Sequence, residues 1–159
     1  VEGIDFKPYV NVLDNLKINR VIKTDNDLRK PDKDIDKYSV LGFSRCNFFI
    51  KDVNLKLPTE QIDENSVTYK RELYVNNEEK LNQIREEYNV FLSKCDLEND
   101  LAEAIQDRLE ECLGTEAVVE HLQKKKKYHM VELVNKLTKE DCIKIFNHYN
   151  FACLKKVLE

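Results

Sequence analysis

Apolar residues in the second half of the chain recur every three or four positions, which is the spacing of one helical face. The first such stripe consists of Leu81, Ile84, Tyr88, Phe91, Leu92 and Cys95. Glu78 and Glu79 precede it, where acidic side chains favour the helix N-terminal dipole. The pattern therefore predicts a helix that begins at Glu78 and runs through Cys95.

A second stripe predicts a helix that begins at Leu97 and ends at Gly114, because glycine is the residue type that most often terminates a helix. Its apolar members are Leu97, Leu101, Ala104, Ile105, Leu109, Cys112 and Leu113. Thr115 and Glu116 then open a third helix. That helix carries Val118, Val119 and Leu122, and the same spacing resumes at Met130, Val131, Val134 and Leu137. The pattern leaves open whether residues 124–127 continue the helix or break it.

The last part of the chain predicts two further helices. Thr138 followed by Asp141 resembles a capping box, with Asp in place of Glu. The helix that it starts carries Cys142, Ile145, Phe146 and Tyr149. A final short helix is predicted from Phe151, Leu154 and Leu158.

The first half of the chain is less regular. Pro8 suits the first position of a helix that runs to about Lys23, and residues 24–36 are polar enough to predict an exposed loop. Residues 46–57 fit both a helical and a strand period, and we favour the helix because the rest of the chain is helical. Residues 67–75 form either a helix or the second strand of a hairpin, depending on the structure of residues 46–57. The alternative is therefore a β-hairpin between residues 46 and 75.

These patterns predict a mainly α fold, a single-domain helical bundle of about five to seven helices over residues 1–159. Residues 1–75 form its less regular part, and residues 76–159 form the clear helical part. The composition is 42% hydrophobic and 35% charged, which is typical of a globular chain with a charged surface. No apolar run approaches the roughly 20 residues that a membrane span requires.

Lysine and asparagine are abundant whereas alanine, glycine and proline are scarce. This bias predicts an A/T-rich source, such as a parasite or a large DNA virus. The five cysteines contain no closely spaced pair, so we expect free, buried thiols in a cytoplasmic or nuclear protein. Export from a pathogen, with one or two disulfides, is the alternative.

Charge is unevenly distributed along the chain. The formal net charge is 0 over residues 1–75, −9 over residues 76–123 and +5 over residues 124–159. One interpretation is that the acidic and basic helices simply pack beside each other. The other is that a charged face docks a partner protein, and its candidate residues are Lys124, Lys125, Lys126, Lys127 and His129.

Motifs for catalysis are absent from the sequence. The three glycines cannot form a phosphate-binding glycine loop. The histidines form no metal-binding H-E-x-x-H motif, and a zinc site would have to be assembled from Cys142, His148, Cys153 and His129, whose spacing does not favour it. No local signature marks any cysteine as an activated nucleophile. The sequence therefore predicts no catalytic residue, no metal and no cofactor.

We accordingly predict a non-enzymatic protein-protein interaction module, such as an adaptor, an assembly subunit or a pathogen factor that acts on host proteins. The alternative is a nucleic-acid-binding helical or winged-helix-like domain that uses the basic C-terminal part. Nucleic acid is disfavoured, because the chain is acidic overall and the lysine run offers no arginine for bidentate base contacts.

Overall fold

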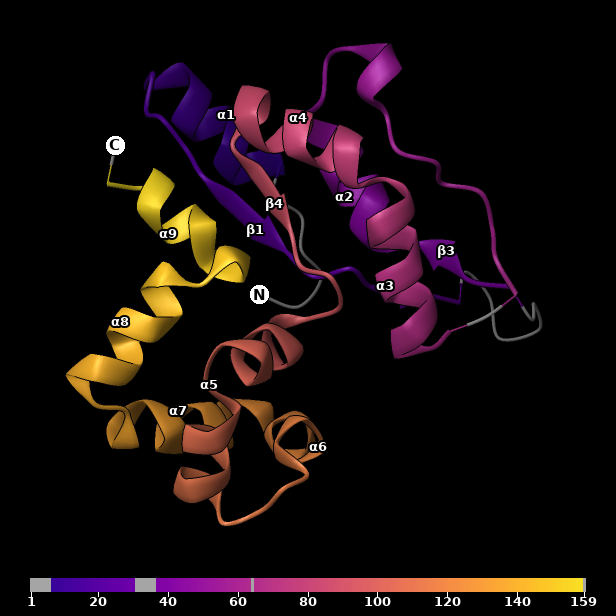
Figure 1. Ribbon diagram of the computed structural model, residues 1–159. Coiled ribbons are helices and arrows are strands. Elements are labelled where there is room, and N and C mark those ends of the chain that lie inside the picture. Colours follow the sequence, from indigo (N-terminus) through magenta and orange to yellow (C-terminus); the bar gives the residue numbers. More distant parts are fainter. Residues whose placement is uncertain (1–6, 31–36, 64, 159) are drawn as a thin grey trace.

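The computed structural model describes residues 7–30, 37–63 and 65–158. In these ranges the protein is mainly α-helical with a small β element, which confirms the predicted fold class. Two short parallel strands, β1 (Ile22–Thr24) and β4 (Val90–Leu92), lie side by side at the centre of the molecule (Figure 1). Helices from both halves of the chain surround this pair.

The helices follow the chain in two groups. The first group is α1 (Lys7–Asn15), α2 (Leu41–Phe49), the 3-10 helix η1 (Val53–Leu55), α3 (Val67–Asn76) and α4 (Glu78–Tyr88). The second group is α5 (Leu97–Leu113), α6 (Val118–Lys124), α7 (Lys126–Lys136), α8 (Lys139–Asn147), the 3-10 helix η2 (Tyr149–Phe151) and α9 (Ala152–Lys156). A small antiparallel pair joins β2 (Leu28–Arg29) to β3 (Ser39–Val40).

Both faces of the parallel strand pair are covered. Ile22 pairs with Val90, and both side chains enter the hydrophobic core of the first helix group. Lys23 points to the opposite face, because successive side chains of a strand alternate. Its ammonium reaches the Asn150 carbonyl at 2.9 Å and lies 5.4 Å from the Phe151 ring centre, so η2 covers that face.

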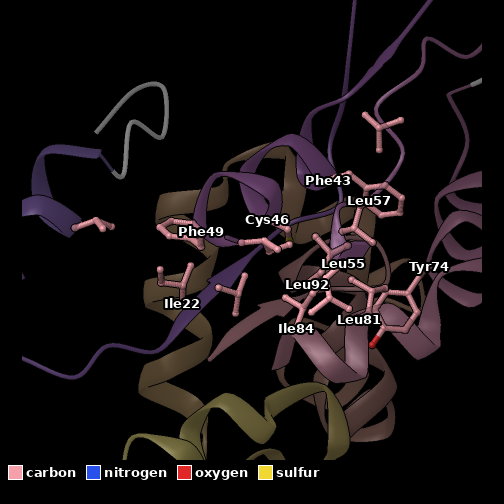
Figure 2. Packing of buried hydrophobic residues seen from close by; sticks show 14 residues of the cluster. Ile22, Phe43, Cys46, Phe49, Leu55, Leu57, Tyr74, Leu81, Ile84 and Leu92 are labelled. Carbon is pink, nitrogen blue, oxygen red and sulfur yellow. The ribbon is translucent and has the colours of Figure 1, made fainter. Parts of the chain in front are cut away.

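Each helix group has its own hydrophobic core. The first core packs β1, β4, α2, α4 and η1 together around fully buried Phe43, Cys46 and Ile84 (Figure 2). The second core joins α5 to α6, α7 and η2 through Leu109, Leu122 and Leu133, which are also inaccessible or nearly so. The C-terminal helices therefore curl around α5 and return towards β1 (Figure 1).

The helix predicted from Glu78 through Cys95 is wrong in its second half. It ends at Tyr88, because Asn89 adopts a left-handed conformation with φ 54°. The chain then continues as strand β4, whose three residues are all buried. A strand covered on both faces has apolar side chains at consecutive positions, so Phe91 and Leu92 also fitted the helical stripe by coincidence.

The prediction for the N-terminal helix is also corrected. Helix α1 ends at Asn15 and Lys17 has φ 54°, so residues 22 and 23 form part of strand β1 instead of a helix. The predicted exposed loop over residues 24–36 begins with buried Thr24 and Asn26 and then forms strand β2. Residues 31–36 lie outside the described residues.

Residues 46–75 are partly helical. The alternative of a β-hairpin is wrong, because the described residues of this segment form no hairpin. Helix α2 begins earlier than expected, at Leu41, and ends at Phe49; η1 and helix α3 follow. A single β-bridge joins Ile62 to Tyr38, which lies outside the predicted hairpin.

The C-terminal predictions are largely confirmed. Helix α5 ends at Gly114 with φ 66°, and Thr138 and Asp141 form the complete capping box of α8. The chain breaks at Lys125, which has φ −136° and ψ 58° and separates α6 from α7. Within the described residues, no helix has both the length and the apolar character that crossing a membrane requires.

All five cysteines are free thiols. Cys46, Cys95 and Cys153 are buried, whereas Cys142 is exposed, so its predicted place on a buried stripe is wrong. Burial raises the pKa of Cys46 to about 12 and that of Cys95 to about 11. These buried thiols therefore remain protonated at neutral pH, which disfavours them as nucleophiles.

Candidate active site

Acidic residues follow the carboxyl ends of both parallel strands. Asp25 and Asp27 come directly after β1, and Asp96 and Glu98 follow β4 at the beginning of α5. Because the strands are parallel, these two segments meet at the same edge of the sheet. The carboxyl ends of parallel strands are where open α/β sheets bind their ligands.

The segment after β1 is held by the backbone around it. The Asn26 side chain is fully buried, and its amide nitrogen donates to the carbonyl oxygens of Lys70 at 2.9 Å and Lys94 at 3.3 Å. A Cβ atom on Gly42 would lie only 2.8 Å from the Asp25 carbonyl oxygen, so glycine is needed there. This close packing fixes Asp25 and Asp27 on either side of Asn26.

Burial and neighbouring negative charge raise the pKa of Asp25 above its ordinary value. Burial contributes most, followed by the carboxylate of Asp27, with smaller contributions from Glu98 and Asp96. The Lys126 ammonium acts in the opposite direction. Burial and repulsion between carboxylates of both strand ends thus act in the same direction on Asp25.

Lys126 supplies the positive charge at this edge. Its Nζ lies 2.8 Å from Oε1 of Glu98, a side chain that is only 1% exposed, whereas Lys126 itself is 52% exposed. Apart from this ion pair, no described group donates a hydrogen bond to that Glu98 oxygen. Burial works against the charge of Lys126, but Glu98, Asp25 and Asp96 together raise its pKa, so the side chain is an ammonium at neutral pH.

The other two acidic residues have structural partners. One Asp96 oxygen accepts the Asn99 backbone N–H at 2.9 Å and caps α5, and the other accepts the Gln123 side chain at 3.1 Å. Asp27 pairs with Arg45 of α2 at 2.7 Å. Asp96 thus ties α6 to the first turn of α5, and Arg45 orients the Asp27 carboxylate.

The structure divides the predicted partner-binding residues. Lys124, Lys125 and Lys127 are exposed at the junction of α6 and α7, whereas Lys126 turns towards the carboxylates. His129 is partly buried: its ring stacks on His121 with the centres 3.9 Å apart. His129 is thus partly covered by His121, whereas three of the lysines are exposed.

The alternative zinc ligands do not come together. Among the residues that the structure describes, no group of three His, Cys, Asp or Glu side chains has the arrangement of a metal site. Cys142 is exposed on α8 and Cys153 is buried on α9, while His148 accepts the Asn150 N–H at 3.4 Å.

Sequence reasoning missed the carboxylates of this edge. The available signal was the pair of aspartates at positions 25 and 27, which follow a segment with the β-branched residues Val21, Ile22 and Thr24. The prediction of a helix to Lys23 concealed it, because acidic residues after a helix are usually solvated. The contribution of Lys126 had no local signal, since its partner Glu98 lies 28 positions away.

A comparison with curated proteins finds Endonuclease GajA of Bacillus cereus (strain VD045), which is 37% identical over 166 aligned positions. The alignment covers 99% of this chain and 29% of that protein, so the chain spans less than a third of its relative's length. No family model matches the chain.

This similarity overturns several predictions. A chain so similar to part of an endonuclease is poorly described as a non-enzymatic interaction module, so the predictions of that function and of no enzymatic activity are wrong. The alternative of a nucleic-acid-binding domain agrees better with the relative, which conflicts with our disfavouring of nucleic acid. The relative is bacterial, and the expected parasite or viral source has no support.

Proposed function

We propose that this chain forms the catalytic part of a nuclease and hydrolyses phosphodiester bonds at the edge where β1 and β4 end. The observation that carries the proposal is the buried Glu98 carboxylate paired with Lys126 beside Asp25, in a chain that resembles an endonuclease over nearly its whole length. Carboxylates and a fixed ammonium in one place are the groups that phosphoryl chemistry requires.

Hydrolysis of a phosphodiester places extra negative charge on the phosphoryl oxygens in the transition state. A positive group that is already in position stabilises this charge without further reorganisation. Lys126 fits this role, because its ammonium is charged at neutral pH and is held by Glu98 while the side chain stays half exposed. We assign Lys126 to a non-bridging phosphate oxygen of the substrate.

The carboxylates fit a divalent cation that the substrate helps to bind. Mg²⁺ is commonly held by one or two carboxylates, with water and substrate phosphate oxygens completing its shell. Asp25 and Glu98 are suitable ligands, because Asp25 is crowded by negative charge and the buried Glu98 oxygen has no described partner besides the Lys126 ammonium. When bound, such a cation polarises the phosphate and lowers the pKa of water.

The protein's own groups then have distinct tasks. The Asp25 carboxylate accepts a hydrogen bond from the attacking water and orients it. Asp27 and Arg45 position the segment that carries Asp25. Lys126 faces the phosphate from the α7 side.

The test is Asp25→Asn in the protein that carries this chain, assayed by nicking of a supercoiled plasmid with Mg²⁺. We expect cleavage to fall by roughly 10²-fold or more, because the oriented proton acceptor is removed. Glu79→Gln, an exposed carboxylate on α4, is the matched control and should keep wild-type activity. Wild-type cleavage by the Asp25 variant would refute the proposed site.

A further inference from the structure

Three of the four consecutive lysines at the α6–α7 junction do not take part in the ion pair of the candidate active site. Lys124, Lys125 and Lys127, here called the lysine surface, are all exposed. No carboxylate in the described part of the chain forms an ion pair with any of them, whereas Lys126 pairs with Glu98. The uncompensated positive charge is therefore concentrated directly beside the site.

The lysine surface is fixed in position relative to the site. Gln123 at the end of α6 is bound to Asp96, and Lys126 at the start of α7 is bound to Glu98. Lys125 lies between these two contacts, at the break where the chain leaves helical geometry. Two contacts to the first turn of α5 thus hold the junction of α6 and α7 against the carboxylates.

We propose that Lys124, Lys125 and Lys127 bind the phosphate backbone of a nucleic acid on either side of the bond that is cut. This inference rests on the proposed nuclease function and extends it from the site to the substrate. Lys124, Lys125 and Lys127 lie within two positions of Lys126, so their Cα atoms are at most about 7.6 Å from that of Lys126. The three lysines therefore meet phosphates within a few nucleotides of the one at Lys126.

Electrostatics favour a nucleic acid as the occupant. Residues 76–123, which supply Asp96 and Glu98, have a formal net charge of −9 and repel a polyanion. A substrate that carries one charge per nucleotide can approach these carboxylates only if nearby cations offset the repulsion. The lysine surface supplies three such cations, and lysine side chains are common donors to phosphate oxygens.

The experiment measures binding of a labelled DNA duplex to the full protein by fluorescence anisotropy in EDTA, across a series of KCl concentrations. The triple variant Lys124→Gln, Lys125→Gln, Lys127→Gln is compared with Lys51→Gln, Lys56→Gln, Lys80→Gln. The control lysines are also exposed but lie on α4 and on the segments beside η1, at the other end of the molecule (Figure 1).

The slope of log K against log [KCl] is negative, and we expect its magnitude to fall by about 0.9 in the lysine-surface variant for each phosphate that is no longer neutralised. The control variant should leave the slope unchanged. Equal slopes for all three proteins, or an equal decrease in both variants, would overturn the inference. Circular dichroism melting of each variant checks that the fold is retained.

The two proposals fail separately. Weakened binding by the lysine-surface variant, together with unchanged cleavage by Asp25→Asn, would support the surface and refute the site. Unchanged binding by the lysine-surface variant, together with abolished cleavage by Asp25→Asn, would support the site and refute the surface.

Discussion

Two lysine–carboxylate pairs flank the first turn of α5, and they differ in what surrounds the lysine. Glu98 and Asp100 are both acidic residues of that turn, and both are 1% exposed. Lys23, which pairs with Asp100, is 19% exposed and also contacts the Asn150 carbonyl and the Phe151 ring. Lys126, which pairs with Glu98, is 52% exposed.

The difference separates a structural pair from the pair to which we assign a function. The Lys23 ammonium is enclosed by α5 and η2, so it connects β1 to the C-terminal helices and is poorly placed to meet a substrate. Lys126 has the same chemistry, but it opens to solvent beside Asp25. Two carboxylates that are equally buried can thus have different roles, and the exposure of the lysine that pairs with each one distinguishes them.

Removing the enclosed lysine should give the largest effect on folding. Lys23→Met leaves Asp100 as a buried charge without its partner, and losing one member of such a pair costs about 3–5 kcal/mol. Urea unfolding of wild type and variant measures this cost. Lys23→Arg, which keeps the charge, should recover part of it, and a free energy of unfolding unchanged by Lys23→Met would contradict the structural role.

Removing the open lysine should affect cleavage more than folding. Lys126→Met removes the charge that we propose stabilises the transition state, and deletion of one such group lowers kcat by about 10²–10³-fold. Glu98 loses its partner too, but this pair is open to solvent at Lys126, so the cost in unfolding free energy should be smaller than the about 3–5 kcal/mol expected for the enclosed pair. Plasmid nicking and urea unfolding of the same sample separate the two effects. If Lys126→Met loses as much unfolding free energy as Lys23→Met but cleaves DNA at the wild-type rate, the two pairs do not differ in the way that we propose.

The smallest expected effect is a gain in stability from Asp25→Asn. The pKa of the Asp25 carboxyl is raised in the folded protein, so its charged form destabilises the fold at pH values above that pKa. This penalty disappears once the pH falls below the pKa of the same carboxyl in the unfolded chain. In EDTA at neutral pH, the variant should therefore melt slightly above wild type. The difference in Tm should shrink as the pH falls towards the ordinary value of 3.8. A variant that melts lower at neutral pH would contradict the crowding of negative charge at Asp25.

Most of the helices are determined by residues that lie close together in the sequence. Helix α5 with its stop at Gly114, and helix α8 with its Thr138–Asp141 capping box, follow from side chains within a few positions of one another. One face of each helix is apolar and the other polar, so the 3.6-residue period is visible in the sequence. The mainly α class was therefore predictable.

The central strands and the site were decided by the tertiary structure. Strands β1 and β4 are too short and too completely covered to show an alternating pattern, and they pair across 68 positions of sequence. Their parallel pairing brings Asp25 to Glu98, and the folding of α6 and α7 brings Lys126 to the same place. The charged residues were visible in the sequence. Their convergence depends on contacts between distant segments, and a local hydrophobic period carries no information about such contacts.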